Sequence, residues 1–226
     1  MSEHTNFVLP HWLYWGWLLL MPLVLMWFTR GAATAGAPDE GTAVEVLAEE
    51  DPALHDPGNR FTRAIDWLSE QSGVFVALWT VNAVCVYFYE VISRYLFDAP
   101  TIWAHQASYL MFGMQYLLAG AFALLHGAHV RVDVLYVKLP PRGQIGMDIF
   151  TSTFFFIFAL ALLGSCWQFF VNSLDMLERT DETWQVQFYP VKGVMVLGAV
   201  LLTLAGVSKL IKDVRLFVRT GGSDSR

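Results

Sequence analysis

The stretch IFTSTFFFIFALALLGSCWQFFVNSL, residues 149–174, decides the fold class of this chain. It contains no Asp, Glu, Lys or Arg and is rich in Phe, Leu and Ala. The hydrocarbon core of a bilayer is about 30 Å thick and needs roughly 20 apolar residues in helical form. This stretch meets that length. Because backbone groups in lipid must hydrogen-bond within their own segment, we expect a membrane-spanning helix here.

Four more stretches lack charged residues, namely residues 5–29, 71–89, 99–130 and 193–208. The last is shorter than a bilayer core requires. It reaches full length if the preceding Tyr and Pro are included and the flanking lysines extend their charged ends outward. The sequence therefore predicts an all-α integral membrane protein with five spans: Trp12–Phe28, Gly73–Ile92, Gln106–His126, Ile149–Phe170 and Pro190–Ile211.

The first span has two readings. Ala33-Thr34-Ala35 offers a small-residue cleavage site, as in a signal peptide, but no Lys or Arg precedes Trp12, and signal peptides begin with basic residues. We expect a retained helix over residues 1–29. Seven carboxylates fall between Asp39 and Asp56, so residues 30–60 are expected to be an acidic flexible linker in the cytoplasm. A membrane domain over 61–217 follows, and it opens with an amphipathic segment at Phe61–Ser69 that places Phe61, Ile65 and Leu68 on one side. A cytoplasmic tail over 218–226 completes the chain.

Lys and Arg predict the orientation of the spans, because cytoplasmic flanks carry an excess of both. With the N-terminus in the periplasm and the C-terminus in the cytoplasm, three of the 14 fall outside: Arg94, Arg179 and Lys192. The other eleven fall inside: Arg30, Arg60, Arg63, Arg131, Lys138, Arg142, Lys209, Lys212, Arg215, Arg219 and Arg226. We therefore expect a multi-pass membrane protein with this orientation.

Several function classes find no support in the sequence. A net charge of −6 argues against a nucleic-acid partner. Neither a Gly-x-Ser-x-Gly turn nor a Walker-type phosphate loop occurs, so we expect no enzyme and no catalytic residue. His126 and His129 lie one helical turn apart, but no carboxylate or Cys completes a metal site. We expect no cofactor and no metal, with a haem- or quinone-binding respiratory anchor as the alternative and a self-sufficient small channel as a third possibility.

Two polar groups stand out near the ends of spans. Glu90 and Arg94 are four residues apart on one helical face. They are read either as a contact with a neighbouring helix or subunit, or as an ion pair at the membrane surface. His129, Arg131 and Asp133 form a second set. It is read either as part of an arm lying along the membrane or as ordinary juxtamembrane charge.

These groups belong to a pattern with a definite order. Arg94-Tyr95 is followed by Pro100 with Trp103 three residues later, then by His129-Val130-Arg131-Val132-Asp133 and Leu139-Pro140. The pattern resembles the small membrane subunit of tripartite ATP-independent periplasmic (TRAP) transporters, the DctQ family. The position of Trp184 before Tyr189-Pro190 is similar too, and the resemblance covers about residues 61–217.

The resemblance implies a four-helix DctQ-like membrane core with amphipathic arm helices, to which this chain adds one N-terminal transmembrane helix. It implies a scaffold role beside a large membrane subunit, which carries the substrate and sodium sites. It also implies symport of an organic acid delivered by a periplasmic substrate-binding protein. The chain departs from the family at Ala104-His105-Gln106, where members often carry acidic residues.

Two sets of candidate site residues follow. For the joint with the large subunit or for the arms, the candidates are Glu90, Arg94, Pro100, Trp103, His129, Arg131 and Asp133. For docking of the binding protein they lie in the outer acidic loop, whose alternative reading is a solvated connection: Asp175, Glu178, Asp181 and Glu182.

Overall fold

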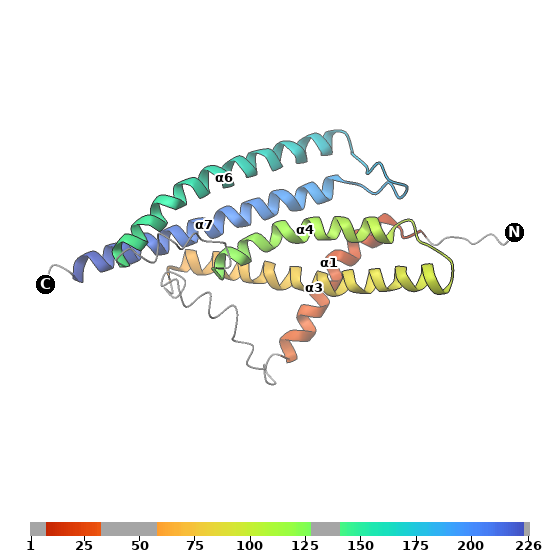
Figure 1. Ribbon diagram of the computed structural model, residues 1–226, viewed down its shortest axis with the longest axis horizontal. Helices are drawn as coiled ribbons and strands as arrows, with labels where there is room; N and C mark the ends of the chain where they lie inside the picture. Colours follow the sequence, from red (N-terminus) through yellow and green to blue (C-terminus); the bar gives the residue numbers. More distant parts are fainter. Residues whose placement is uncertain (1–7, 33–57, 128–140, 224–226) are drawn as a thin grey trace. The chain divides into compact units, whose positions relative to one another are not determined.

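The computed structural model describes residues 8–32, 58–127 and 141–223. Within these ranges the regular elements are all helices: α1 (His11–Ala32), α3 (Arg60–Leu96), α4 (Ala104–Leu125), α6 (Pro141–Asp175) and α7 (Tyr189–Ser223) (Figure 1). The described part of the chain contains one isolated β-bridge, between Arg179 and Gln187, and no strand. The expectation of an all-helical protein is confirmed.

Four of the described helices are long and apolar enough to cross a membrane. They are α3, α4, α6 over Gly143–Asp175 and α7 over Tyr189–Arg219. The apolar part of α1, His11–Trp27, is shorter. The predicted four-helix core with an additional N-terminal helix is therefore present, and the crossing of the membrane by α1 remains a prediction.

Three of the helices are longer than the charge-free stretches that predicted them. α3 has 37 residues and α6 and α7 have 35 each. At a rise of about 1.5 Å per residue such helices are more than 50 Å long, which exceeds a hydrocarbon core of about 30 Å. A helix continues through charged residues, so the end of a charge-free stretch does not mark the end of the helix. The helix ends where residues cap its free backbone groups. At the start of α3 the backbone N–H of Asn59 donates to Thr62 Oγ1 at 2.8 Å, as in a capping box.

The amphipathic segment expected at Phe61–Ser69 is continuous with α3 rather than a helix of its own. Its predicted apolar face is also incorrect in part. Ile65 is buried, but Phe61 and Leu68 are exposed. The buried face is instead made by Thr62, Ile65 and Ser69, because three- and four-residue steps bring these positions onto one side of the helix.

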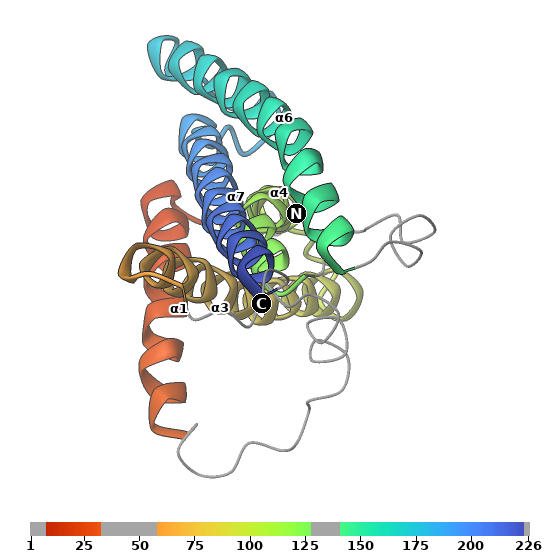
Figure 2. The same cartoon turned by 90° about the vertical axis from the view of Figure 1, so that its left-hand side faces the viewer.

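The described helices belong to two compact units. Unit 1 comprises residues 1–37, 74–117 and 166–196, and unit 2 comprises residues 38–73, 118–165 and 197–226. In unit 1, α1 crosses α3 steeply (Figures 1 and 2). The core of unit 1 contains large side chains from three helices, including Leu18, Trp79, Leu110, Met111 and Met114.

In unit 2, glycines allow helices to approach closely. A Cβ atom added at Gly73 of α3 would lie 2.1 Å from the Phe122 ring of α4. A Cβ atom added at Gly206 of α7 would lie 2.2 Å from the Phe155 ring of α6. Each glycine thus makes room for an aromatic ring of the neighbouring helix.

Unit 2 also contains a partly buried ion pair between α3 and α7. Lys212 Nζ donates to Asp66 Oδ2 at 2.7 Å, and Ser208 Oγ donates to Asp66 Oδ1 at 2.7 Å. Lys212 was expected among the positive charges on the cytoplasmic side of the membrane, but the residue is only 4% exposed. The difference arises because α7 continues past the apolar stretch and packs against the start of α3.

Candidate functional site

The first polar cluster of unit 1 lies where α3 ends and α4 begins. Glu90 is buried, and its carboxylate accepts hydrogen bonds from the Arg94 guanidinium, the Thr101 hydroxyl and the Thr101 backbone N–H, the last at 3.1 Å. The turn contains Asp98 at a φ of 49°, and Ser93 Oγ donates to the Ala99 carbonyl at 2.6 Å. Glu90 therefore fixes the connection between α3 and α4, while 46% of the Arg94 side chain stays exposed.

Trp103, which lies at the end of this connection, packs into the core of unit 1. Its ring stacks on Tyr89 at a centroid distance of 5.9 Å and contacts Trp184 at 6.4 Å. Pro100, the neighbouring candidate, is exposed. The structure thus places four of the predicted joint residues, Glu90, Arg94, Pro100 and Trp103, at one end of α3 and α4. His129, Arg131 and Asp133 lie outside the described residues.

The acidic loop between α6 and α7 is a short hairpin, defined here as residues 176–188. The Thr180 N–H donates to the Val186 carbonyl at 3.0 Å, and the Phe188 N–H donates to the Glu178 carbonyl at 2.9 Å. Trp184 and Val186 are buried on one side, whereas Asp181 and Glu182 are exposed on the other. The hairpin is therefore a folded element with an acidic outer surface rather than a purely solvated connection.

Glu178 is the exception among the four acidic candidates. Its carboxylate forms an ion pair with the Lys192 ammonium at the start of α7. A hydrogen bond from that ammonium holds the pKa of Glu178 below its usual range. Glu178 thus helps to close the hairpin onto α7, while Asp175, Asp181 and Glu182 are exposed.

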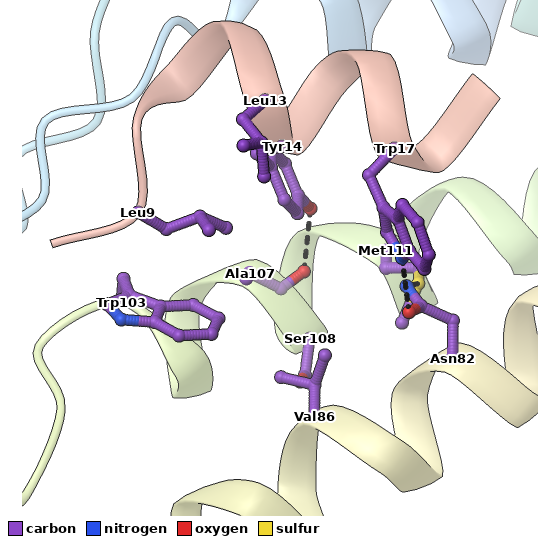
Figure 3. Close-up of a pocket in the computed structure, with 10 residues that line it drawn as sticks. All are labelled: Leu9, Leu13, Tyr14, Trp17, Asn82, Val86, Trp103, Ala107, Ser108 and Met111. Atoms are coloured by element: carbon purple, nitrogen blue, oxygen red, sulfur yellow. Dashed lines mark hydrogen bonds between the residues drawn. The ribbon is translucent and has the colours of Figure 1, made fainter. Parts of the chain in front are cut away.

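Helix α1 is attached to the rest of unit 1 by directional hydrogen bonds. The Tyr14 hydroxyl donates to the Ala107 carbonyl at 2.7 Å, and Trp17 Nε1 donates to Asn82 Oδ1 at 2.9 Å (Figure 3). In the other direction, Trp79 Nε1 donates to the Leu18 carbonyl at 2.8 Å. These contacts were not predicted from the sequence. Their signal was the Trp- and Tyr-rich start of α1, since buried Trp and Tyr usually find a partner for their polar end.

The hairpin is itself tied to α1 through Trp184. The indole Nε1 of Trp184 donates to the Leu9 carbonyl at 2.9 Å. His11 Nε2 lies 3.0 Å from the Trp184 carbonyl oxygen and donates to it, because a carbonyl can only accept. The Tyr14 ring meets the Trp184 ring edge-on at 5.1 Å. The position of the hairpin thus depends on α1 and the residue just before it, through contacts that span 173 and 175 residues of the sequence.

Polar side chains within the long helices of unit 1 bind to one another. Gln115 Nε2 lies 3.2 Å from the Val76 carbonyl oxygen and 3.3 Å from Thr80 Oγ1. Gln106 Nε2 donates to the Thr180 hydroxyl of the hairpin. Asn82 Nδ2 contacts Met111 Sδ at 3.4 Å. These groups join α3 to α4 and α4 to the hairpin.

A cavity of about 200 Å³ lies inside unit 1, between α1, α3 and α4. Figure 3 shows Leu9, Leu13, Tyr14 and Trp17 reaching into it from α1 and the residues just before it. Its other walls come from α3 and α4 and consist of Asn82, Val86, Trp103, Ala107, Ser108 and Met111.

His126 and His105 contact groups within their own units. In unit 2, His126 Nδ1 lies 3.1 Å from the Phe122 carbonyl oxygen and His126 Nε2 lies 3.4 Å from Glu70 Oε2. In unit 1, His105 Nδ1 lies 3.5 Å from the Tyr87 hydroxyl. Among residues 8–32, 58–127 and 141–223, no three His, Cys, Asp or Glu side chains are arranged to hold a metal ion.

A family model matches the chain over residues 83–216, which include the C-terminal part of α3, all of α4 and α6 and most of α7. The model is described as the DctQ component of tripartite ATP-independent periplasmic transporters. A search of curated proteins finds no match. Because the match covers more than half of the chain, including the helices that form the membrane core, this multi-pass membrane protein belongs to the DctQ family, the small component of TRAP transporters.

Proposed function

We propose that this chain is the small permease subunit of a TRAP transporter and acts as a scaffold for the large membrane subunit. The complex takes up an organic acid by sodium-coupled symport, and a periplasmic binding protein delivers the substrate. The chain lies in the bacterial inner membrane with its N-terminus in the periplasm and its C-terminus in the cytoplasm. The charge distribution along the sequence supports this orientation.

The observation that carries the scaffold role is the division between polar and apolar side chains on the long helices. Asn82, Gln106 and Gln115 are buried and bind neighbouring helices or the hairpin. The exposed surface is mostly apolar. On α6, where Gln168 and Asn172 are exposed polar exceptions, the large exposed apolar side chains include Phe150, Phe154, Ile157, Phe158, Leu160, Trp167 and Phe169. Such a surface suits lipid or a second membrane protein and provides no path for a charged substrate.

The proposed joint with the large subunit is the cluster at the α3–α4 connection, together with His129, Arg131 and Asp133. The half-exposed Arg94 supports this assignment, because Arg can form two parallel hydrogen bonds with a partner carboxylate and is enriched at interfaces. Pro100 is exposed beside it. Glu90 and Trp103 position these residues from within the core.

Co-purification tests this joint. In cells that make both membrane subunits, Arg94→Ala, His129→Ala, Arg131→Ala and Asp133→Ala should each reduce the amount of large subunit recovered with a tagged small subunit. Arg63→Ala is the matched control, because Arg63 is an exposed arginine in the other unit. Full recovery and normal transport in all four variants would show that the joint lies elsewhere.

The proposed docking surface for the binding protein is the acidic face of the hairpin, formed by Asp181 and Glu182 with Asp175 and Glu178 nearby. The rigid hairpin supports this role, because a fixed loop loses little entropy on binding. Asp181→Lys with Glu182→Lys should weaken binding protein affinity most strongly at low ionic strength. The control Asp181→Glu with Glu182→Asp keeps the charge and should bind normally. Equal transport by all forms at every ionic strength would contradict the proposal.

Reconstitution separates the scaffold from a self-sufficient channel. Vesicles that contain both membrane subunits and the binding protein should take up substrate when a sodium gradient is present. Vesicles that contain only this chain should not. Uptake by this chain alone would refute the scaffold role.

A further inference from the structure

The side chains that line the cavity in unit 1 indicate which kind of molecule fits there. It measures about 200 Å³ and is lined mainly by the carbon atoms of aromatic and aliphatic side chains. The Ser108 hydroxyl is the one polar group of the wall without a hydrogen-bond partner among the described residues, and the other polar side chains named here are engaged. The Tyr14 hydroxyl donates to the Ala107 carbonyl, Trp17 donates to Asn82, and the amide of Asn82 contacts Met111 Sδ (Figure 3).

Water is a poor occupant of such a space. A buried water molecule needs two to four polar partners, and apolar cavities of about 150 Å³ stay dry and accept small hydrocarbons instead. An empty cavity of this size is also unfavourable, because side chains that line a void lose dispersion contacts. The occupant expected from the wall is therefore a hydrocarbon.

The cavity opens toward the exposed apolar surface of α1, which we expect to face the acyl chains of the membrane. Leu13 and Trp17 line the cavity and are also 37% and 54% exposed, so the cavity wall continues into the exposed apolar surface of α1. That surface includes Leu20 and Val24 farther along the same helix. The opposite wall belongs to α3 and α4, which are both long and apolar enough to cross a membrane.

We propose that this cavity binds an acyl chain of a membrane phospholipid. The chain fills the space between α1 and the helices α3 and α4, and it adds apolar contact to an attachment that otherwise depends on hydrogen bonds. α1 lies outside the residues that match the family model, so this lipid site is a property of the additional helix. The inference is independent of the proposed joint and of the proposed docking surface.

Photocrosslinking tests the proposal. The purified chain is reconstituted in phosphatidylethanolamine vesicles with a trace of the same lipid carrying a diazirine within one acyl chain. Crosslinks should concentrate on the peptides around Leu9–Trp17 and Val86. Val86→Phe narrows the cavity from α3 and should lower this labelling about tenfold, equivalent to roughly 1.4 kcal/mol or the burial of about two methylene groups. Ala77→Phe is the control, since Ala77 is exposed on α3 and does not line the cavity.

A second variant distinguishes loss of the lipid from a local rearrangement caused by the larger side chain in Val86→Phe. Leu9→Trp fills the cavity from the opposite wall and should lower the labelling to the same extent. Even labelling along the exposed faces of α3 and α6, unaffected by either variant, would mean annular lipid only and would overturn the proposal. Labelling by a diazirine fatty acid but not by the diazirine phospholipid would overturn it as well.

Discussion

Replacing Trp184 with Phe should loosen the hairpin without unfolding the membrane helices. The change removes the indole N–H that donates to the Leu9 carbonyl at 2.9 Å. It keeps an aromatic ring against Tyr14, and it keeps the backbone carbonyl that accepts from His11. The substitution therefore tests whether α1 positions the hairpin through this one side chain.

The expected cost has two parts. A hydrogen bond of this kind contributes about 1 kcal/mol net. The smaller ring leaves a gap at a residue that is only 3% exposed, and this costs about another 1 kcal/mol. Together these amount to about 2 kcal/mol, which corresponds to roughly 30-fold faster exchange of the hairpin amides if exchange occurs through local opening.

Hydrogen–deuterium exchange measured by mass spectrometry is the suitable assay. The reporters are the amides of Thr180 and Phe188, which donate across the hairpin. Trp12→Phe is the control, because Trp12 belongs to the same helix as His11 but is 76% exposed. If the hairpin amides exchange at the same rate in both variants, the inference that α1 positions the hairpin is wrong. Faster exchange with unchanged affinity for the binding protein would keep the coupling but refute the docking role.

Three further predictions concern stability. Lys212→Met leaves the Asp66 carboxylate without its buried partner and should cost about 3 kcal/mol, and Asp66→Asn added to it should restore part of the loss in a thermal unfolding series. The pKa of Glu178 is lowered in the folded state, so the Glu178–Lys192 pair should stabilise the hairpin at neutral pH. This stability should disappear as the pH falls through the lowered pKa, and Glu178→Gln should remove that pH dependence of hairpin exchange. Gly73→Ala should destabilise by about 1–3 kcal/mol through overlap with Phe122, whereas Gly113→Ala, where a Cβ meets open space, should stabilise by about 0.5–1 kcal/mol.

The membrane helices could be predicted from the sequence because their signal is local. A bilayer excludes charge, so the gaps between charged residues locate the spans directly. The ends of the helices could not be placed in this way. Asn59 and Thr62 set the start of α3 through a hydrogen bond, well before the apolar stretch begins.

The candidate site was predictable only where its residues lie close together in the chain. Glu90 and Arg94 form the pair that their four-residue spacing suggested, but the additional contact with Thr101 depends on the path of the turn. The hairpin was read as a loop because its acidic residues dominate the sequence there. Its burial depends on Trp184, whose hydrogen-bond partner Leu9 is 175 residues away. No local pattern encodes such a distance.

The attachment of α1 has a consequence for evolution. Asn82 and Trp79 bind their partners on α1, and both lie on a helix that is expected to sit in lipid. A homologue without this helix would present an amide and an indole N–H directly to hydrocarbon, which is unfavourable for polar groups. Aligned homologues should therefore carry apolar residues at these two positions whenever the N-terminal helix is missing, so that gain of the helix and gain of the polar pair occurred together.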